Sequence, residues 1–406
     1  MNVIGIVAEY NPFHKGHLYH LEETKKRGQA DCIVAVMSGN FTQRGEPAMI
    51  NKWKRAEIAI KNGVDLVIEL PFAFACNNAE YFARGAIKIF EGLGCISKFS
   101  FGSEKGNLEE LIKTARVLAF EDNDFKLLIK KYSNKGLSYP KARYEALCEY
   151  RGSEVASAVM HPNNILGVEY LKEWLRLNSK MEPMAVKRKG SGYHDLELHD
   201  EISSASAIRQ SIDKNRGLNQ IKHTVPLSTI KVLEDFDFNS FLTLNDLFEL
   251  FVYKILSTDR DELESILSAT EGLENRLKKS IIKSKNTDDL IRKIKTKRYT
   301  STRVQRLLIH TLIGLKKEDF FDILNSKILY ARILGLSKKG SDLLALINKQ
   351  GCSTIPILNK ITKEIEKDEI WKLIKYDILS SDIYNLLSLK DTYTYSDLVQ
   401  KPFIYF

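Results

Sequence analysis

The amino-acid sequence predicts an α/β fold, with a doubly wound parallel sheet in the first half of the chain and a mostly helical second half. In the first hundred residues, short apolar runs alternate with stretches of helical composition, which is typical of βαβ units around a parallel sheet. From about residue 216 onward Leu, Ile, Lys and Asp dominate, and the apolar residues recur at helical spacing. We therefore expect two domains, at residues 1–215 and 216–406.

The strands expected in the first domain are its short apolar runs, which are Val3–Ala8, Cys32–Met37, Leu66–Leu70, Ile96–Phe101 and Met184–Lys187. The helices expected between the first four strands cover residues 16–27, 52–62 and 79–91. Gly63 and Gly92 follow the last two of these helices, and a glycine just past a helix end is a common stop signal. A more helical insertion is expected from about residue 107 to 180. The string "ISSASAIRQSI" (residues 202–212) then predicts a helix that starts behind a capping serine.

Composition excludes several classes of protein. Of the 406 residues, 44% are hydrophobic and 28% are charged, as in ordinary globular proteins. No apolar run is long enough to span a bilayer, and the first residues lack the features of a secretory signal, so we expect a cytoplasmic protein without a membrane partner. The five cysteines are scattered and form no CxxC pair, which indicates neither a disulfide framework nor a protein-bound metal. Nothing in the sequence indicates a protein partner.

The segment behind the first expected strand concentrates the residues that can do chemistry. "EYNPFHKGHLYH" (residues 9–20) places three of the eight histidines within seven positions. Ligands of an open parallel sheet bind at the carboxyl ends of its strands, where an anion is also favoured by the start of the next helix. His14 and His17 flank Gly16, whose missing side chain lets a ligand approach the backbone. Histidines that donate to phosphate oxygens stabilise the charge that develops as an α-phosphate is attacked. The alternative is that these histidines cap the helix or fill the core.

The string His14-Lys15-Gly16-His17 resembles the HxGH signature of a nucleotidylyltransferase superfamily, which implies a Rossmann-like domain. That superfamily carries a second phosphate-binding signature, ISSTxxR, and "ISSASAIR" (residues 202–209) resembles it with an altered centre. Ser204 and Ser206 can donate hydroxyl hydrogen bonds, and Arg209 can neutralise phosphate charge. A serine helix cap with a surface arginine is the alternative.

Longer strings resemble one bacterial family, the tRNA(Met) cytidine acetate ligases. They are "GIVAEYNPFHKGHLYHL", "VMSGNFTQRGEPAMINKWKRAEIAIKNGVDLVIELPF", "FGSE", "HPNNILGVEYL" and "VKRKGSGYHD". The resemblance implies that acetate is activated by ATP as acetyl-adenylate, with release of pyrophosphate. It further implies transfer of the acetyl group to N4 of the wobble cytidine of elongator tRNA(Met), which forms N4-acetylcytidine. ATP with Mg²⁺, acetate and this tRNA would then be the ligands.

The resemblance and the position of the first turn together predict the site. His14 and His17 are the candidate catalytic residues. Arg44, behind the second expected strand, fits either a carboxylate or phosphate ligand or a structural ion pair. The implied ATP contacts are Val7, Ala8, Glu9, Tyr10, Asn11, Pro12, Phe13, His14, Lys15, Gly16, His17, Leu18, Tyr19, His20, Gly102, Asn163, Arg188, Ser206 and Arg209.

Most of the excess positive charge lies in one segment. Residues 276–306 hold twelve basic and two acidic side chains, a net charge of +10, whereas the whole chain carries +9. Such a concentration suits a polyanion, and Tyr299 is suited to stacking on an unpaired base. A solvated helix face and a membrane surface are the alternatives. The residues expected to bind tRNA are Lys293, Lys295, Lys297, Arg298 and Arg303.

Two other functions fit part of the sequence. A small-molecule cofactor adenylyltransferase would need ATP and the HxGH turn, but it would not need the basic helical half. A non-catalytic RNA-binding protein with a relic nucleotide site would need the basic segment, but it would not need the histidines. The sequence contains both features, which favours the tRNA-modifying ligase over either alternative.

Overall fold

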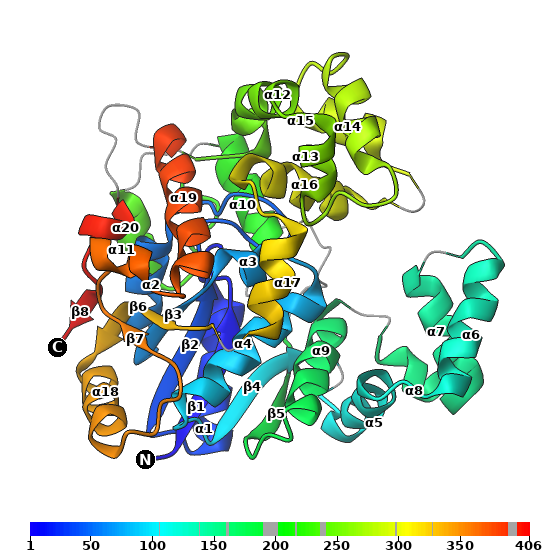
Figure 1. The fold of residues 1–406 in the computed structure, drawn as a ribbon. Helices are drawn as coiled ribbons and strands as arrows, with labels where there is room; N and C mark the ends of the chain where they lie inside the picture. The colour runs from blue at the N-terminus through cyan, green and yellow to red at the C-terminus, as the bar shows by residue number, and fades with distance from the viewer. Residues whose placement is uncertain are drawn as a thin grey trace.

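A mixed sheet with the strand order β5-β4-β1-β2-β3-β6-β7 forms the centre of the fold, and β8 pairs with β6 (Figure 1). The computed structural model describes residues 1–104, 106–137, 139–159, 162–189, 202–215, 217–235, 241–296, 299–326, 328–388 and 396–406. The strands of the first half all run parallel, and they are β1 (Val3–Ala8), β2 (Cys32–Ser38), β3 (Leu66–Leu70), β4 (Lys98–Ser103) and β5 (Glu182–Lys187). The predicted α/β fold is therefore confirmed.

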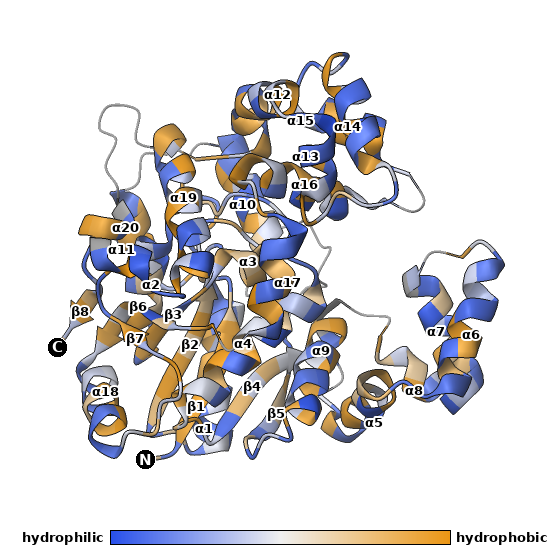
Figure 2. Cartoon of the chain, in the orientation of Figure 1, coloured by the Kyte–Doolittle hydropathy of each residue, from blue (hydrophilic) through white to orange (hydrophobic). Residues whose placement is uncertain are grey.

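Helices cover both faces of this sheet, which explains why its strands read as continuous apolar runs. All seven residues of β2 are buried. Its Ile33, Ala35 and Met37 pack with helices α1 (Lys15–Gly28) and α2 (Lys52–Lys61). Alternate residues of the same strand point to the opposite face and pack with α4 (Ala79–Leu93) and α9 (Pro162–Arg176). Figure 2 shows the apolar strands between helices that are apolar on the inner side.

The second half of the chain also contributes to the sheet, which the sequence analysis did not predict. Strand β6 (Ala331–Ser337) runs antiparallel to β3, and β7 (Ile357–Leu358) and β8 (Phe403–Tyr405) pair with β6. Residues 216–406 are mostly helical, as expected, but they complete the sheet of the first half. The two parts of the chain thus share one sheet. The domain boundary at residue 215 stays a prediction.

The remaining helices form two groups and a set that packs around the sheet (Figure 1). The insertion between β4 and α9 consists of α5 (Leu108–Ala119), α6 (Asn123–Asn134), α7 (Tyr139–Arg151) and α8 (Ser153–Ser157). A second group, α12–α16, consists of α12 (Phe248–Ser257), α13 (Arg260–Ser265), α14 (Leu273–Ile281), α15 (Thr287–Ile294) and α16 (Ser301–Ile313). The others are α3 (Phe72–Ala75), α10 (Ala205–Asn215), α11 (Leu227–Glu234), α17 (Lys317–Asn325), α18 (Lys338–Gln350), α19 (Trp371–Ser388) and α20 (Ser396–Val399). Within the described ranges, none of the helices has both the length and the apolar character that crossing a bilayer requires.

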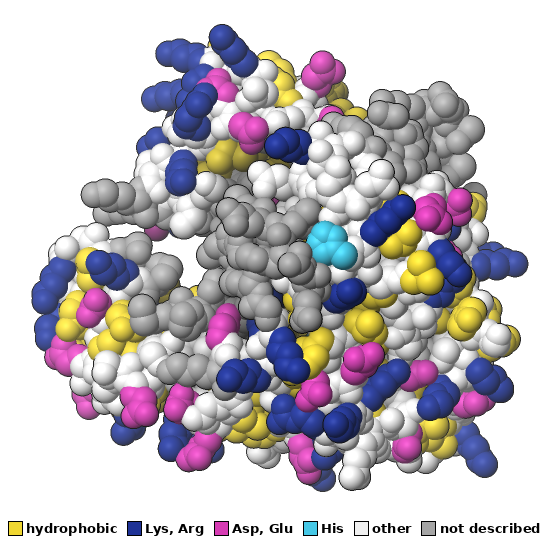
Figure 3. Space-filling view, turned by 180° about the vertical axis from the view of Figure 1, so that it is seen from behind, with side chains coloured by type: hydrophobic (Ala, Val, Ile, Leu, Met, Phe, Trp, Pro, Cys, Tyr) yellow, Lys and Arg dark blue, Asp and Glu magenta, His cyan; other side chains and the backbone are white. Residues whose placement is uncertain are grey.

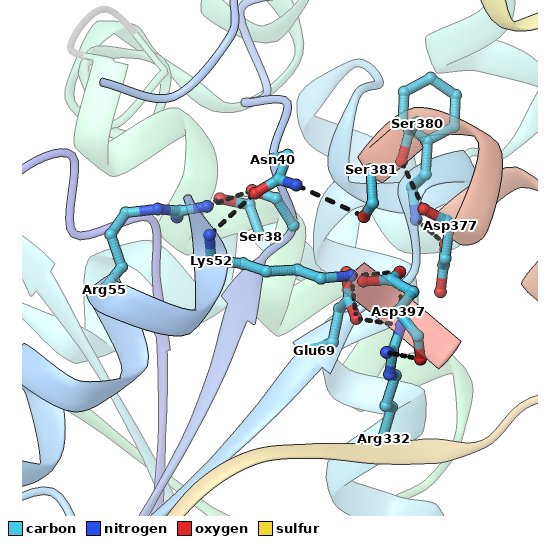
Figure 4. A network of polar contacts seen from close by, with 12 residues as sticks. Ser38, Asn40, Lys52, Arg55, Glu69, Arg332, Asp377, Ser380, Ser381 and Asp397 are labelled. Carbon is cyan, nitrogen blue, oxygen red and sulfur yellow. Dashed lines mark hydrogen bonds and ion pairs between the residues drawn. The ribbon is translucent and has the colours of Figure 1, made fainter. Parts of the chain in front are cut away.

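A buried cluster of charges joins the end of the chain to the sheet (Figure 4). Lys52 Nζ lies 2.6 Å from Glu69 Oε1 and 2.7 Å from Asp397 Oδ2. Arg332 Nη1 lies 2.7 Å from the same Asp397 oxygen and 3.3 Å from Glu69 Oε2. Two cations thus face two carboxylates, all of them buried. Removing one partner of such a cluster leaves an uncompensated buried charge, which is strongly destabilising, so α20 is held firmly to α2, β3 and β6.

Candidate active site

The turn between β1 and α1 uses its two histidines as helix caps. His14 is the N-cap of α1, and its Nδ1 accepts a hydrogen bond from the backbone N–H of Gly16 at 3.0 Å. The backbone N–H of His14 donates in turn to Nδ1 of His17 at 3.3 Å. Because a neutral imidazole that accepts at Nδ1 carries its proton on Nε2, both rings are fixed as Nε2–H donors. Both histidines therefore cap the helix, and this is compatible with the predicted chemical role, because capping uses only the Nδ1 atoms.

The histidine rings lie close together in a buried site that keeps them neutral. The His14 and His17 rings stack with their centroids 3.7 Å apart. Burial, with a smaller contribution from the nearby Arg188 and Arg209 guanidinium groups, lowers the pKa of His14 to about 3. Burial also lowers the pKa of His17 well below the ordinary value and that of His20 to about 4. At neutral pH the turn therefore offers uncharged hydrogen-bond donors.

These depressed pKa values predict that acid destabilises the folded protein. His14 and His20 stay neutral in the native state until about pH 3 and 4, whereas they bind protons below about 6.5 when the chain is unfolded. The unfolded state therefore binds more protons between these limits, so the stability present above pH 6.5 is lost as the pH falls towards the folded pKa values. The loss is up to about 1.4 kcal/mol per pH unit for each histidine.

Denaturant unfolding at pH 7, 6 and 5 measures this dependence. In the variant His20→Asn, which removes one such group, we expect a shallower decline with pH than in the wild type. His20 Nε2 lies 3.0 Å from Ser100 Oγ, and the amide of Asn is chosen as an uncharged replacement. Identical slopes for the two proteins would contradict the assignment of His20 as a partly buried group that stays neutral.

A cavity of about 230 Å³ lies at the carboxyl ends of β1, β4 and β5, beside the start of α10. Ser204 Oγ accepts a hydrogen bond from the N–H of Ala207 at 3.0 Å, so the predicted serine cap is confirmed. Arg209 Nη1 donates to the carbonyl of Asn11 at 2.8 Å and thereby ties the start of α10 to the first turn. Most of the predicted ATP contacts line this cavity, namely Val7, Ala8, Glu9, Tyr10, Asn11, His14, Gly16, His17, Tyr19, His20, Gly102, Arg188, Ser206 and Arg209.

Four predicted ATP contacts lie outside the cavity wall, and the side chain of a fifth is not described. Phe13 is buried in the apolar core, and the exposed Lys15 has its backbone N–H bonded to the carbonyl of Thr224 at 2.9 Å. Pro12 and Leu18 also lie outside the lining, because only some residues of a turn and helix can face one side. Asn163 lies in the first turn of α9, but its side chain is outside the described part of the structure.

Sequence reasoning missed part of the cavity wall that comes from the loop after β2. Thr42, Gln43 and Glu46 line the cavity beside Arg44. The Gln43 N–H donates to Glu9 Oε1 at 2.7 Å, and burial raises the pKa of this carboxyl group despite that bond. The rule that ligands bind at strand ends applies to β2 as well as to β1, so this signal was present in the sequence. The apolar wall, formed by Phe82, Phe101, Leu166 and Tyr170, carried no comparable signal.

Comparison with known proteins identifies the family to which these motifs belong. A family model described as HIGH Nucleotidyl Transferase matches residues 1–397. The tRNA(Met) cytidine acetate ligase of Caldicellulosiruptor saccharolyticus is 44% identical over 402 residues, which are 98% of this chain and 97% of that protein. The chain belongs to the tRNA(Met) cytidine acetate ligase family. The member from Clostridium tetani is 39% identical over 409 residues and 99% of both chains, so the resemblance seen in the sequence strings is confirmed.

Solved structures of this family share the whole fold. The apo crystal structure of Thermotoga maritima TmcAL matches this chain with a TM-score of 0.94 and 31% identity, with both chains covered completely. A second structure, described as TmcAL bound with alpha-thio ATP, matches with a TM-score of 0.91 over the same extent. The helical second half and its strands are therefore part of the family fold.

The basic segment of this family member forms α14, α15 and the start of α16, and Lys and Arg side chains gather there in Figure 3. Lys293 and Arg292 both pair with Asp289, at 2.6 and 2.8 Å. Arg303 packs over the ring of Tyr299 and donates to Thr270. The exposed cations of the basic segment are Arg276, Lys279, Lys283, Lys285, Arg292, Lys293 and Lys295. Lys297 and Arg298 lie outside the described residues.

Two residues of the basic segment have roles that differ from the predicted ones. The Tyr299 ring is buried and its hydroxyl donates to the carbonyl of Glu271 at 3.0 Å, so the expectation that it stacks on a base is wrong in this structure. Arg306 points into the first half of the protein and donates from Nη1 to the carbonyl of Gln43 at 3.1 Å. A count of charges in the sequence cannot separate such inward-facing cations from exposed ones.

Proposed function

We propose that this protein is an ATP-dependent ligase that acetylates N4 of the wobble cytidine of elongator tRNA(Met). In the first step, a carboxylate oxygen of acetate attacks the α-phosphorus of ATP, and the bond to pyrophosphate breaks to leave acetyl-adenylate. In the second step, the cytidine N4 attacks the acetyl carbonyl, AMP leaves, and N4 loses a proton. The proposal rests on membership of a family whose named members are tRNA(Met) cytidine acetate ligases.

The observation that carries the first step is the pair of Nε2–H donors at the end of β1. His14 and His17 are fixed in this tautomer by the helix cap, and both line the cavity. Donors that are oriented before the reaction stabilise developing negative charge without reorganisation. A ligand phosphate would also lie at the start of α1, where the helix favours anions. The TmcAL structure described as bound with alpha-thio ATP supports ATP as the nucleotide.

Positive charge around the cavity supports the same assignment. Arg188 and Arg209 line the cavity and are close enough to His14 to lower its pKa. Lys189 places Nζ 4.7 Å from the centroid of the Tyr19 ring, beside the same wall. ATP would enter with Mg²⁺ on its phosphates. We assign no protein ligands to this ion, since the described residues hold no cluster of three or more His, Cys, Asp or Glu side chains suited to a metal.

An exchange experiment tests the proposed first step. We expect labelled pyrophosphate to enter ATP in a reaction that needs acetate and does not need tRNA, because acetyl-adenylate forms before the acetyl transfer. Exchange driven by nicotinamide mononucleotide or phosphopantetheine, and not by acetate, would favour a cofactor adenylyltransferase. Mass spectrometry of nucleosides from tRNA incubated with ATP and labelled acetate tests the second step, and labelled N4-acetylcytidine is the expected product.

A further inference from the structure

The loop at residues 41–47, which follows β2, forms one side of the cavity. The Thr42 N–H donates to the carbonyl of Glu46, and the Gly45 N–H donates to the carbonyl of Thr42, both at 2.9 Å. Phe41 and Pro47 form an isolated antiparallel bridge that closes the loop. Thr42, Gln43, Arg44 and Glu46 all line the cavity. The loop is therefore a compact unit that presents polar side chains to the ligand.

The sheet order places this loop on the opposite side of β1 from two of the predicted ATP contacts, Gly102 and Arg188. In the order β5-β4-β1-β2, Gly102 lies at the end of β4 and Arg188 follows β5, both on one side of β1, whereas the loop follows β2 on the other side. The histidine turn behind β1 lies between the two sides. If ATP occupies the β4 and β5 side with its phosphates over the turn, the loop faces the space left for the second substrate. Arg44 lines the cavity on this side, and a guanidinium group has a geometry that matches a carboxylate.

Helix α16, from the basic half of the chain, holds the loop from behind. Arg306 Nη1 donates to the Gln43 carbonyl at 3.1 Å, and Gln305 Nε2 donates to Glu46 Oε1 at 3.1 Å. Gly45 has φ +76°, and a Cβ atom placed on it would lie 2.5 Å from the backbone nitrogen of Arg306. The helix backbone thus packs directly on the loop, and glycine is required at this contact.

The other side of the loop contacts the catalytic turn. The Gln43 N–H donates to Glu9 Oε1 at 2.7 Å, so this residue is bonded to α16 through its carbonyl and to Glu9 through its N–H. Glu46 lies 3.9 Å from Arg209, whose guanidinium donates to the carbonyl of Asn11. Displacement of α16 would therefore move the loop relative to the end of β1.

We propose that the loop at residues 41–47 forms the acetate side of the cavity and that Arg306 and Gln305 are positioning residues that hold it there. This inference rests on the proposed function, because it names the subsite for the acid. It gives the helical half a task in acetate activation, in addition to tRNA capture. According to this inference, Arg306 supports the loop and does not belong to the tRNA-binding surface, although it is one of the twelve cations of the basic segment.

Kinetics of pyrophosphate exchange without tRNA test this inference. In Arg306→Ala the loop loses its support, and we expect the KM for acetate to rise about tenfold, since small displacements of a binding group have large effects. The KM for ATP should stay within about twofold, because Gly102 and Arg188 lie on the other side of β1. In the part of the chain that the structure describes, the loop touches the predicted ATP contacts only at Glu9 and Arg209. Arg306→Lys should restore most of the acetate affinity, since an ammonium group also donates to a carbonyl. Gln305→Ala should raise the KM for acetate by about threefold, as it removes one hydrogen bond.

The control is Arg260→Ala, which removes an exposed arginine of the same helical group at the start of α13. Both KM values should be unchanged in this variant. Equal changes of the two KM values in Arg306→Ala, or no change in either, would overturn the inference. Should Arg306→Ala fail to fold, Gln305→Ala decides, and an unchanged KM for acetate in that variant overturns it. Absence of acetate-dependent exchange in the wild type would instead contradict the proposed function itself.

Discussion

Replacing either His14 or His17 by alanine is expected to lower the rate of acetate-dependent pyrophosphate exchange by about a hundredfold or more. Each substitution removes one Nε2–H donor from the cavity, and loss of one preorganised donor has an effect of about this size in other enzymes. Both rings line the cavity, and both have their Nδ1 atoms occupied by backbone donors. The effect should fall on kcat, because these donors act on charge that develops in the transition state.

The capping role of His14 calls for a second variant. Alanine at an N-cap costs about 1 kcal/mol of stability, so part of any loss in His14→Ala could come from the helix. Asn is a favoured N-cap residue whose side-chain oxygen can accept the Gly16 N–H, but it lacks the Nε2–H donor. We expect His14→Asn to unfold at the wild-type temperature and to be as inactive as His14→Ala. If His14→Asn kept full activity, His14 would serve only as a cap.

Local pattern was sufficient to predict the half of the fold that surrounds this turn. β1 and β3 coincide with their apolar runs, since parallel strands buried on both faces must be apolar throughout. The HxGH turn and the serine cap of α10 were visible because short-range hydrogen bonds require particular residues at particular spacing. The sequence pattern therefore reveals interactions between residues that lie close together in the chain.

Contacts between distant segments were not visible in that pattern. Strand β6 is a short apolar run inside a helical region, and its position in the sheet depends on pairing with β3. Lys52 looks like an ordinary surface lysine at a helix start, yet it is buried against Asp397. Arg306 is one cation among twelve in its segment, and only the fold shows that its partner is the carbonyl of Gln43. Charge and hydropathy identify a class of partner, but they do not identify the partner.

The exposed part of the basic segment leads to the second large expected effect, which concerns tRNA. We would reverse the charges of Lys279, Lys283, Lys285 and Lys295 to Glu. These four are exposed, and they make no ion pair with any residue that the structure describes, in contrast to Lys293, which pairs with Asp289. We expect tRNA binding to weaken by about a thousandfold at physiological salt, because each lost phosphate contact forfeits the release of counterions.

Salt dependence and a matched control separate a binding surface from a general change of charge. The slope of log K against log salt should become shallower by about one unit for each lost phosphate contact. A control protein with Lys349, Lys360, Lys367 and Lys372 reversed has the same net charge, and these exposed lysines lie in or between α18 and α19, outside residues 276–306. Since charges far from the RNA are screened over about 8 Å at physiological salt, the control should retain most of its affinity and its slope.

Acetate-dependent pyrophosphate exchange without tRNA should be unchanged in both proteins, because none of the eight lysines lines the cavity. The combination of lost tRNA binding and intact exchange would place capture and activation on different surfaces of one chain. Equal loss of affinity in the two reversed proteins would mean that net charge alone attracts the tRNA. Unchanged affinity in the first would leave the basic segment as a solvated surface, and the tRNA contact would then have to be sought near the cavity, around Lys187 and Lys189, which are exposed at the end of β5.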